Sequence, residues 1–438
     1  MDSYPASRAS TSSVSLGSNS PPTSSEASLV GARVTLPDLL NHQDLLPLDD
    51  SAQFVLVVGG LGFIGSHTTL ELLKEGYNVI VVDDLSNSYG DVLSRVASLA
   101  QEHCKANRQK MPYLKFHHCD YRTSEMGYLL KQYDAPVYFS PSTPTPSETT
   151  PRTRSRISSV IHFAAFKAVE ESIQSPLSYY QNNVCGLVDF LVLLKEHNIT
   201  NFVFSSSATV YGEKTKTGKP LREADVVHHI EIHGNEARIP GVIGLTSPYG
   251  RTKYFCEAIL ADVAYADPSW KITALRYFNP VGCHESGLLG EDPRQKPTNL
   301  FPVIMSVLAG TKQTLEVFGS DWDTVDGTPV RDFIHVTDLA RGHIAACVAQ
   351  ENQIPFRTYN LGTGKGSSVA EAIASFEAAA SRKIPVIYAG RRPGDVGSCV
   401  AETEKVNREL GWKTEKTLDE CARDAWNFMV KSKAANVC

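Results

Sequence analysis

Tyr249 and Lys253 are the first residues in this chain whose types and spacing suggest chemistry. They lie four positions apart in the stretch Ser247-Pro-Tyr-Gly-Arg-Thr-Lys253, and this spacing places two side chains on one face of a helix. A phenol has a pKa of about 10, and a nearby ammonium group favours its ionised form. We therefore expect Tyr249 to act as a general base near neutral pH, supported by Lys253.

A hydroxyl-rich segment, Phe204-Ser-Ser-Ser-Ala-Thr-Val-Tyr-Gly212, follows a predicted buried strand. Side chains at the carboxyl end of a parallel strand face the ligand crevice of an open α/β sheet. Ser207, or one of its neighbours, is thereby placed to hydrogen-bond both a substrate hydroxyl and Tyr249.

A glycine-rich loop, Gly59-Gly-Leu-Gly-Phe-Ile-Gly65, directly follows another predicted strand and precedes a helical pattern. Glycines at these positions let the backbone turn tightly and approach a pyrophosphate at the helix N-terminus. Asp83 closes the next strand, 18 residues after Gly65, where a carboxylate can accept hydrogen bonds from ribose hydroxyls and repel a 2′-phosphate. The loop therefore predicts NAD rather than NADP, and together with Ser207, Tyr249 and Lys253 it predicts hydride chemistry on an alcohol or ketone.

The elements that must position these residues alternate between strands and helices. Short runs rich in β-branched residues, such as Phe54–Val58 and Val79–Asp83, read as buried parallel strands. Between them lie helical patterns, for example from Val184 to Leu194. The alternation predicts an α/β fold: a Rossmann-type doubly wound parallel sheet, with a second, smaller α/β substrate-binding domain.

Composition divides the chain further. We expect a disordered, Ser- and Pro-rich tail over 1–50, an NAD-binding domain over 51–280 and a smaller substrate-binding domain over 281–438. Loop insertions are expected at about 136–156, away from the catalytic edge of the sheet, and at about 226–245, where the insertion could touch the substrate entrance.

Charge and cysteine content exclude several classes of protein. The net charge of −6 argues against a nucleic-acid binder, and no stretch approaches the length of a transmembrane helix. The nine cysteines are scattered without a Cys-x-x-Cys pair, so we expect reduced thiols, a cytoplasmic protein and no metal site.

Many motifs in order resemble one family. They are GGLGFIGSHTTLELL from Gly59, VIHFAAFKAVEES from Val160, YYQNNVCG from Tyr179, FSSSATVYG from Phe204, SPYGRTKYF from Ser247, LRYFNPVGCHESGLLGEDP from Leu275, VFGSDWDTVDGTPVRDFIHVTDLARGH from Val317, YNLGTGKG from Tyr359 and GRRPGDV from Gly390. The chain resembles the extended short-chain dehydrogenase/reductases, and among them the family of UDP-glucose 4-epimerases, from about residue 53 to 430.

The resemblance implies roles for individual residues. Tyr249 would be the base, Lys253 would lower its pKa and hold the nicotinamide ribose, Ser207 would orient the sugar hydroxyl, and Asp120 would meet the adenine. The other residues expected at the cofactor are Gly59, Gly62, Phe63, Ile64, Gly65, Asp83, Phe163, Lys167, Asn182 and Phe278. Those expected at the UDP-sugar are Asn279, Asn299, Leu300, Phe318, Arg331, Arg392, Asp395 and Cys399.

The implied reaction interconverts UDP-glucose and UDP-galactose through a 4-keto intermediate, with bound NAD. Cys399 matches a position where the family varies between a bulky Tyr and a smaller residue, so activity on N-acetylhexosamines is a further hypothesis. The resemblance also implies a homodimer, formed through the helices near 180–196 and 250–265. Since the chain ends where the epimerase fold ends, we expect no appended mutarotase domain.

Three alternatives remain beside this interpretation. An epimerase of UDP-pentoses would carry the same motifs. A nucleotide-sugar dehydratase of the same fold would carry Asp-Glu where this chain has Ala208-Thr209. An NAD-binding regulator without turnover predicts a broken Ser-Tyr-Lys set, whereas all three residues are present here.

Overall fold

Seven short apolar segments form the central sheet of the computed structural model, which describes residues 51–136, 153–233, 236–292, 294, 298–349, 354–392 and 394–437. All neighbouring strands in this sheet pair in parallel, in the order β15-β10-β7-β6-β1-β2-β3. The predicted doubly wound parallel sheet is therefore confirmed. The strands are β1 (Phe54–Val58), β2 (Asn78–Asp83), β3 (Leu114–His118), β6 (Ile157–His162), β7 (Asn201–Ser207), β10 (Lys271–Tyr277) and β15 (Phe356–Leu361).

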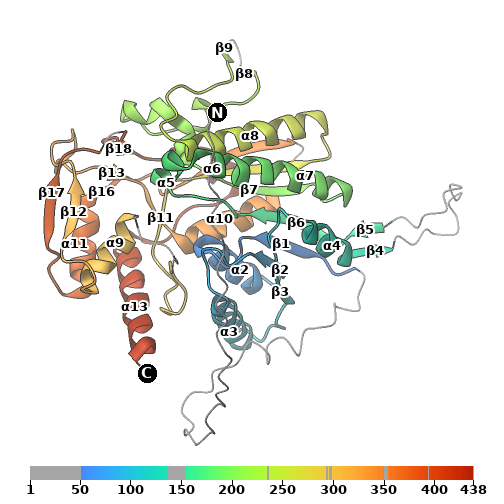
Figure 1. The fold of residues 1–438 in the computed structure, drawn as a ribbon, viewed down its shortest axis with the longest axis horizontal. Helices are drawn as coiled ribbons and strands as arrows, with labels where there is room; N and C mark the ends of the chain where they lie inside the picture. The colour runs from blue at the N-terminus through green and yellow to red at the C-terminus, as the bar shows by residue number, and fades with distance from the viewer. Residues whose placement is uncertain are drawn as a thin grey trace, which may run out of the picture.

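Helices cover both faces of the sheet (Figure 1). Alternate residues of β1 explain why both faces are apolar: Val55 and Val57 pack with α2, α3 and α10, whereas Leu56 and Val58 pack with α4, α7 and α8. On the first face lie α2 (Phe63–Lys74), α3 (Asp91–Ala106), α10 (Val336–Val348) and α12 (Glu404–Leu410); on the second lie α4 (Ser124–Gln132), α7 (Gly186–Glu196) and α8 (Pro248–Ala266).

Shorter helices connect these elements around the carboxyl edge of the sheet. They are α5 (Val169–Gln174), α6 (Pro176–Tyr179), the π-helix η1 (Tyr180–Cys185) and the 3₁₀ segments η2 (Ala208–Thr217) and η3 (Glu223–Asp225).

The second part of the chain has its own hydrophobic core, built around Phe301, Phe333 and Phe376. It lies beside the carboxyl edge of the main sheet, at the left of Figure 1. Its elements are β11 (Asn279–Val281), α9 (Leu300–Leu308), β12 (Leu315–Phe318), β13 (Val330–Arg331), β14 (Phe333–His335), β16 (Ser367–Ser368), α11 (Val369–Ala380), β17 (Val386–Ala389), β18 (Ser398–Cys399) and α13 (Leu418–Val437).

The chain returns to the main sheet after residue 280, where the sequence predicts a domain boundary. β15 pairs with β10 at the edge of the sheet, and α10 packs on the same face as α2. A domain boundary at residue 280 would therefore assign one strand of the main sheet, β15, to the second domain. It would also assign there two helices that cover this sheet, α10 and α12. The reason is that β10 offers an unpaired edge, which a distant apolar strand covers.

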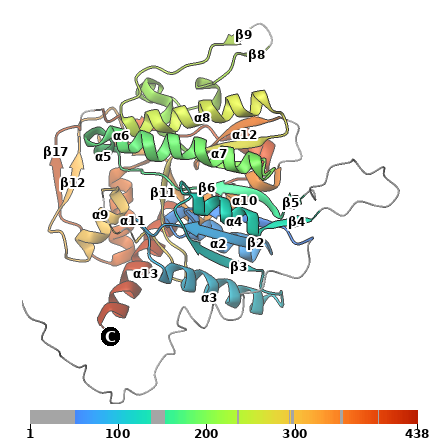
Figure 2. The same cartoon turned by 45° about the vertical axis from the view of Figure 1, so that its right-hand side comes forward.

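Both predicted insertions carry short hairpins. β4 (Asp134–Pro136) and β5 (Thr153–Ser155) precede β6, and they lie at the amino ends of the strands, away from the catalytic edge. β8 (Glu231–His233) and β9 (Glu236–Arg238) extend beyond α8 in two views (Figures 1 and 2). The predicted tail over 1–50, and residues 137–152 of the first insertion, lie outside the described residues.

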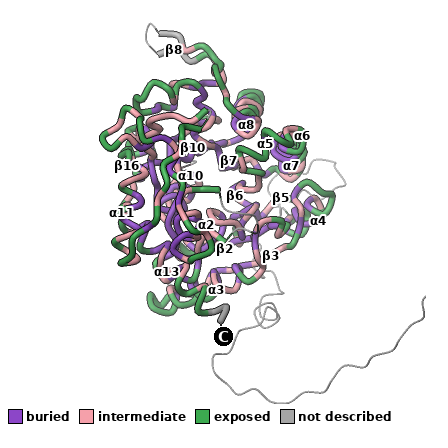
Figure 3. The backbone as a smooth tube through the Cα atoms, turned by 60° about the vertical axis from the view of Figure 1, so that its left-hand side comes forward, coloured by how far each residue is buried: buried purple, intermediate pink, exposed green. Residues whose placement is uncertain are grey.

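Burial follows this layering. Figure 3 shows buried backbone along the strands of the sheet. Within the described part of the chain, no helix is both long and apolar enough to span a membrane.

Candidate active site

A cavity of about 420 Å³ opens at the carboxyl ends of the parallel strands. It is lined by residues from β1, β2, β7 and β10 and from the segment around β11 and α9, so it spans the sheet and the second part of the chain. Most residues that the sequence predicts at the cofactor or substrate lie on its wall. They are Gly59, Gly62, Phe63, Ile64, Gly65, Asp83, Asp120, Phe163, Lys167, Asn182, Ser207, Tyr249, Lys253, Phe278, Asn279, Asn299 and Leu300.

The glycine loop is packed too tightly for side chains. Gly59 has a positive φ of 77°, and a Cβ there would lie 2.8 Å from the backbone nitrogen of Ala164. A Cβ on Gly65 would lie 2.2 Å from the Gly59 carbonyl oxygen. These contacts bring β1, the loop and the start of α2 together, so that the helix N-terminus faces the cavity.

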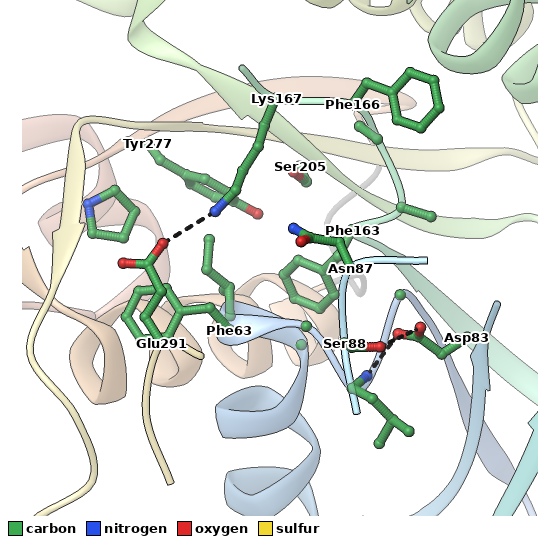
Figure 4. A pocket seen from close by; sticks show the side chains of 18 of the residues that line it. Phe63, Asp83, Asn87, Ser88, Phe163, Phe166, Lys167, Ser205, Tyr277 and Glu291 are labelled. Atoms are coloured by element: carbon green, nitrogen blue, oxygen red, sulfur yellow. Dashed lines mark hydrogen bonds and ion pairs between the residues drawn. The ribbon is translucent and has the colours of Figure 1, made fainter. Parts of the chain in front are cut away.

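Asp83 organises the loop that follows β2. Its Oδ2 accepts a hydrogen bond from the Leu61 amide at 3.0 Å, and its Oδ1 accepts bonds from the Leu85 amide at 2.9 Å and the Ser88 hydroxyl at 2.7 Å. Figure 4 shows Asp83 and Ser88 on one side of the cavity. Because a carboxylate can accept about four hydrogen bonds, one acceptor position remains for a ribose hydroxyl.

Asn87 is a cavity residue that the sequence analysis did not single out. Its Oδ1 is buried and has no hydrogen-bond partner in the described structure, although buried polar atoms are normally paired. Asn87 lies four residues beyond Asp83, in the loop that follows β2. The sequence feature that could have identified it is a polar side chain just after the end of a predicted parallel strand. The orphaned oxygen, the glycine turn and the spare acceptor of Asp83 together fit the adenosine ribose and pyrophosphate of NAD.

Two ion pairs lie on the cavity wall. Lys167 Nζ lies 3.3 Å from Glu291 Oε1, as Figure 4 shows, and Arg122 donates to both carboxylate oxygens of Asp120, at 2.9 and 2.6 Å. Glu291 belongs to a motif that carries the family resemblance, but the sequence analysis gave it no role. Its contact with Lys167 joins the segment after β11 to the loop after β6 across the cavity.

Local sequence sets the positions of Ser207 and Tyr249. Ser207 ends β7 and accepts a hydrogen bond from the Thr209 amide at 3.2 Å, which starts η2. Ser247 caps α8 by accepting from the Gly250 amide at 3.1 Å, and Pro248 occupies the first turn. Tyr249 therefore lies in the first turn of α8, where it hydrogen-bonds to Ser207.

Lys253 is buried one turn further along α8. Its Nζ donates to the Ser205 carbonyl oxygen at 2.6 Å and lies 4.8 Å from the centre of the Phe204 ring. Burial lowers the pKa of Lys253 to about 8, although the nearby Glu257 carboxylate acts against this shift. The ammonium is thus held by the end of β7 rather than by a counter-ion in direct contact.

The pKa of Tyr249 differs from the sequence-based expectation. Burial raises it to about 12, and the hydrogen bond with Ser207 only partly opposes this shift. The Lys253 ammonium lies 6.0 Å from the centre of the Tyr249 ring, a distance at which its attraction does not offset the loss of hydration. In this structure, therefore, the phenol is the favoured form at neutral pH.

Five of the residues predicted at the UDP-sugar do not line the cavity: Phe318, Arg331, Arg392, Asp395 and Cys399. They form a second group, which we call the arginine cluster. Arg331 pairs with Asp395, the Arg392 guanidinium lies 4.0 Å from the centre of the Phe318 ring, and Cys399 faces Arg331 across the β13–β18 pair. Arg392 is exposed, whereas the other four are partly buried.

The arginine cluster adjoins the cavity through the backbone. The amide of Asn279, a cavity residue, donates to the carbonyl oxygen of Asp332 at 3.0 Å, directly after Arg331. The buried Asp332 carboxylate in turn accepts from the amides of Thr363, Gly364 and Ala401. Arg331 is thereby held beside the end of the cavity that Asn279 lines.

None of the described residues in the insertion at about 226–245 lines the cavity. Contact between this insertion and the substrate entrance stays a prediction. Val226 and Val227 are buried instead, and His228 contacts Glu257 inside the molecule. These first residues fill a space behind α8.

Comparison with known proteins agrees with this geometry. A model of the NAD dependent epimerase/dehydratase family matches residues 55–362. UDP-glucose 4-epimerase 2 of Arabidopsis thaliana is 46% identical over 378 residues, covering 86% of this chain and 95% of the relative. The chain belongs to this family, among the UDP-glucose 4-epimerases.

Two further relatives add detail. Bifunctional UDP-glucose 4-epimerase and UDP-xylose 4-epimerase 1 of Pisum sativum is 41% identical over 380 residues, covering 86% of this chain and 96% of the relative. The crystal structure of UDP-glucose 4-epimerase from Bifidobacterium longum in complex with NAD⁺ and UDP is 41% identical, with a TM-score of 0.72, and covers 87% of this chain and 99% of that one.

The buried ammonium of Lys253 makes a prediction about stability. Its pKa falls from 10.5 to about 8 on folding, so between these pH values the unfolded chain binds more protons and stability rises with pH. We expect wild type to gain up to about 3 kcal/mol relative to Lys253→Met between pH 8 and pH 10.5. Urea unfolding of both nucleotide-free proteins at several pH values measures this difference. Parallel pH profiles would contradict the buried, perturbed lysine.

Proposed function

We propose that this protein interconverts UDP-glucose and UDP-galactose by oxidation at C4 and re-reduction from the opposite face. One observation carries the proposal: a single cavity joins the dinucleotide loop to Ser207, Tyr249 and Lys253 and adjoins the arginine cluster. A redox cofactor, a proton-transfer group and cations for a diphosphate are thus close together. Membership in the family of UDP-glucose 4-epimerases supports the same reaction.

NAD⁺, when bound by the glycine loop, Asp83 and Asn87, supplies the hydride acceptor and returns the same hydride, and its positive ring favours ionisation of a nearby phenol. Tyr249 takes the proton of the sugar 4-hydroxyl as C4 becomes a ketone, and it gives the proton back when C4 is reduced. Ser207 orients the hydroxyl, since it already hydrogen-bonds to Tyr249. Proton and hydride are both returned, so the cycle balances without a second substrate.

The arginine cluster would hold the UDP moiety while the keto sugar turns over. Arg331 and Arg392 provide planar donors for a diphosphate in a chain whose net charge is −6. Phe318 packs against the Arg392 guanidinium and so helps to orient it. Placing the binding energy in the nucleotide leaves the sugar free to present either face of C4.

A UDP-pentose 4-epimerase is the second candidate function. The Pisum sativum relative is named for both UDP-glucose and UDP-xylose, and the same C4 chemistry serves either sugar. The dehydratase alternative has less support, since Ala208 and Thr209 stand where it needs an acid pair.

We expect purified protein to convert UDP-galactose into UDP-glucose with no added NAD, because the cofactor is regenerated in each cycle and retained. A coupled dehydrogenase assay measures the product. Tyr249→Phe should lower kcat by about 10²–10⁴-fold, the usual contribution of a general acid–base group, with little change in KM.

Product from wild type but not from the Tyr249→Phe variant would support the proposal. No product with or without added NAD would exclude the galactose reaction, and UDP-pentoses would then be tested in the same way. Wild-type turnover by Tyr249→Phe would reject Tyr249 as the proton-transfer group.

Cys399 supports a hypothesis about specificity. It is a partly buried, small residue in β18, next to Arg331 of the arginine cluster. We expect the protein also to interconvert UDP-GlcNAc and UDP-GalNAc, and Cys399→Tyr to remove that activity while sparing UDP-galactose, because a bulky ring fills the space for an N-acetyl group. Activity of both proteins on the two substrate pairs tests this, and inactivity of wild type on the N-acetylated pair would refute it.

A homodimer is the proposed assembly. Helices α7 and α8 lie side by side (Figure 2), in the ranges that the family resemblance predicts for the interface. They expose the apolar residues Val188, Val192 and Phe255. We expect light scattering to give a dimer for wild type and a monomer for Val192→Asp. A wild-type monomer at micromolar concentration would exclude this assembly.

We further propose a cytoplasmic location. All eight cysteines in the described residues are free, which suits a reducing compartment. Recovery of the native protein with a membrane or secreted fraction would contradict it.

A further inference from the structure

A buried carboxylate lies directly behind the proposed reactive residues. Glu257 follows Lys253 by four positions on α8, as Lys253 follows Tyr249, so the three side chains share one face of the helix. Glu257 is fully buried and does not line the cavity. The proposed reaction gives it no direct role, although burying an ionised group is costly even when the group is paired.

Three side chains, those of Ser206, Arg276 and His228, hydrogen-bond to the Glu257 carboxylate. Oε1 accepts from the Ser206 hydroxyl and from Arg276 Nε, the latter at 3.1 Å. Oε2 accepts from an Arg276 terminal nitrogen at 2.7 Å and from His228 Nε2 at 2.8 Å. The Glu257 and Arg276 side chains are both fully buried, so the pair is shielded from water.

Glu257 and Lys253 form two adjacent links between α8 and the end of β7. Lys253 Nζ donates to the Ser205 carbonyl oxygen at 2.6 Å, and the next residue, Ser206, donates to Glu257. Ser207 follows immediately. The two links therefore fix how far α8 can slide along β7, and with it the position of Tyr249 relative to Ser207.

The second insertion contributes to this arrangement through its first residues. Arg276 donates to the Val226 carbonyl oxygen at 3.0 Å, and the buried His228 ring lies 5.0 Å from the Tyr254 ring on α8. Beyond this point the chain leaves the interior and forms the projecting β8–β9 hairpin (Figure 1). The segment thus connects the β8–β9 hairpin to the buried ion pair.

The neighbouring histidine makes different contacts. His229 stacks on Tyr265 with ring centres 5.1 Å apart, and its Nε2 lies 3.4 Å from Asp262, at the exposed side of α8. Both histidines therefore contact α8, but only His228 reaches Glu257. This difference provides a matched control within one segment.

We infer that Glu257 is a positioning residue for Ser207, Tyr249 and Lys253, and that the insertion supplies His228 to hold its carboxylate in place. The inference rests on the proposed function. Without the His228 bond, the carboxylate can rotate about its remaining contacts and loosen Ser206, which precedes Ser207. The nearby charge of Glu257 also raises the pKa of Lys253 relative to burial alone, which helps to keep it an ammonium.

Three variants of the full-length, NAD-loaded protein test the inference: His228→Leu, His228→Gln and His229→Leu. We expect His228→Leu to lower kcat for UDP-galactose by about 10-fold, a loss in the range of small misplacements of reacting groups, with KM within about twofold of wild type. His228→Gln should restore most of the rate, since its amide can donate to Glu257. His229→Leu should behave as wild type.

Thermal unfolding and the amount of retained NAD are measured on the same samples. The values of kcat are then compared only between samples that are folded and carry NAD. Wild type that fails to turn over UDP-galactose would refute the proposed function, and the positioning role with it. Active wild type with an unchanged kcat in His228→Leu would overturn the positioning role alone. So would a rate loss that His228→Gln does not rescue, or an equal loss in His229→Leu.

Discussion

The parallel pairing of seven strands is the constraint on which the site depends. Because every strand runs the same way, the chemically active residues that end β1, β2, β7 and β10 reach one edge of the sheet. The glycine loop and Asp83 come from two of these ends, and Ser207 comes from a third. Tyr249 and Lys253 join them because α8 packs across the sheet with its first turn at that edge.

Paired charges dominate this edge. Arg331 contacts Asp395, Lys167 contacts Glu291 and Arg122 contacts Asp120. An anionic ligand that binds to these three cations therefore competes with the carboxylates already paired with them. Binding would replace contacts with protein carboxylates by contacts with the ligand. Lys253 differs from these three cations, since burial against a carbonyl oxygen and an aromatic ring leaves its charge near the reacting groups.

The chain after β10 contributes to both the main sheet and the second hydrophobic core, although the sequence predicts a domain boundary between them at residue 280. β11 and β14 begin the second core, yet β15 and α10 return to the first sheet. A cavity between them is thus walled by both cores. This arrangement lets a nucleotide-sugar lie beside a dinucleotide, each bound by elements with separate packing.

The sequence by itself determined the parallel α/β fold, the glycine loop and the Ser207, Tyr249 and Lys253 set, because periodicity and local turn chemistry depend on neighbouring residues. Family resemblance then pointed to the arginine cluster. Only the tertiary structure decided that β15 completes the sheet, that Asn87 and Glu291 face the cavity, and that His228 contacts Glu257. It also decided the pKa direction of Tyr249, which burial raises although a lysine lies one turn away. Such properties depend on contacts between distant segments and on lost hydration, neither of which spacing along a chain encodes.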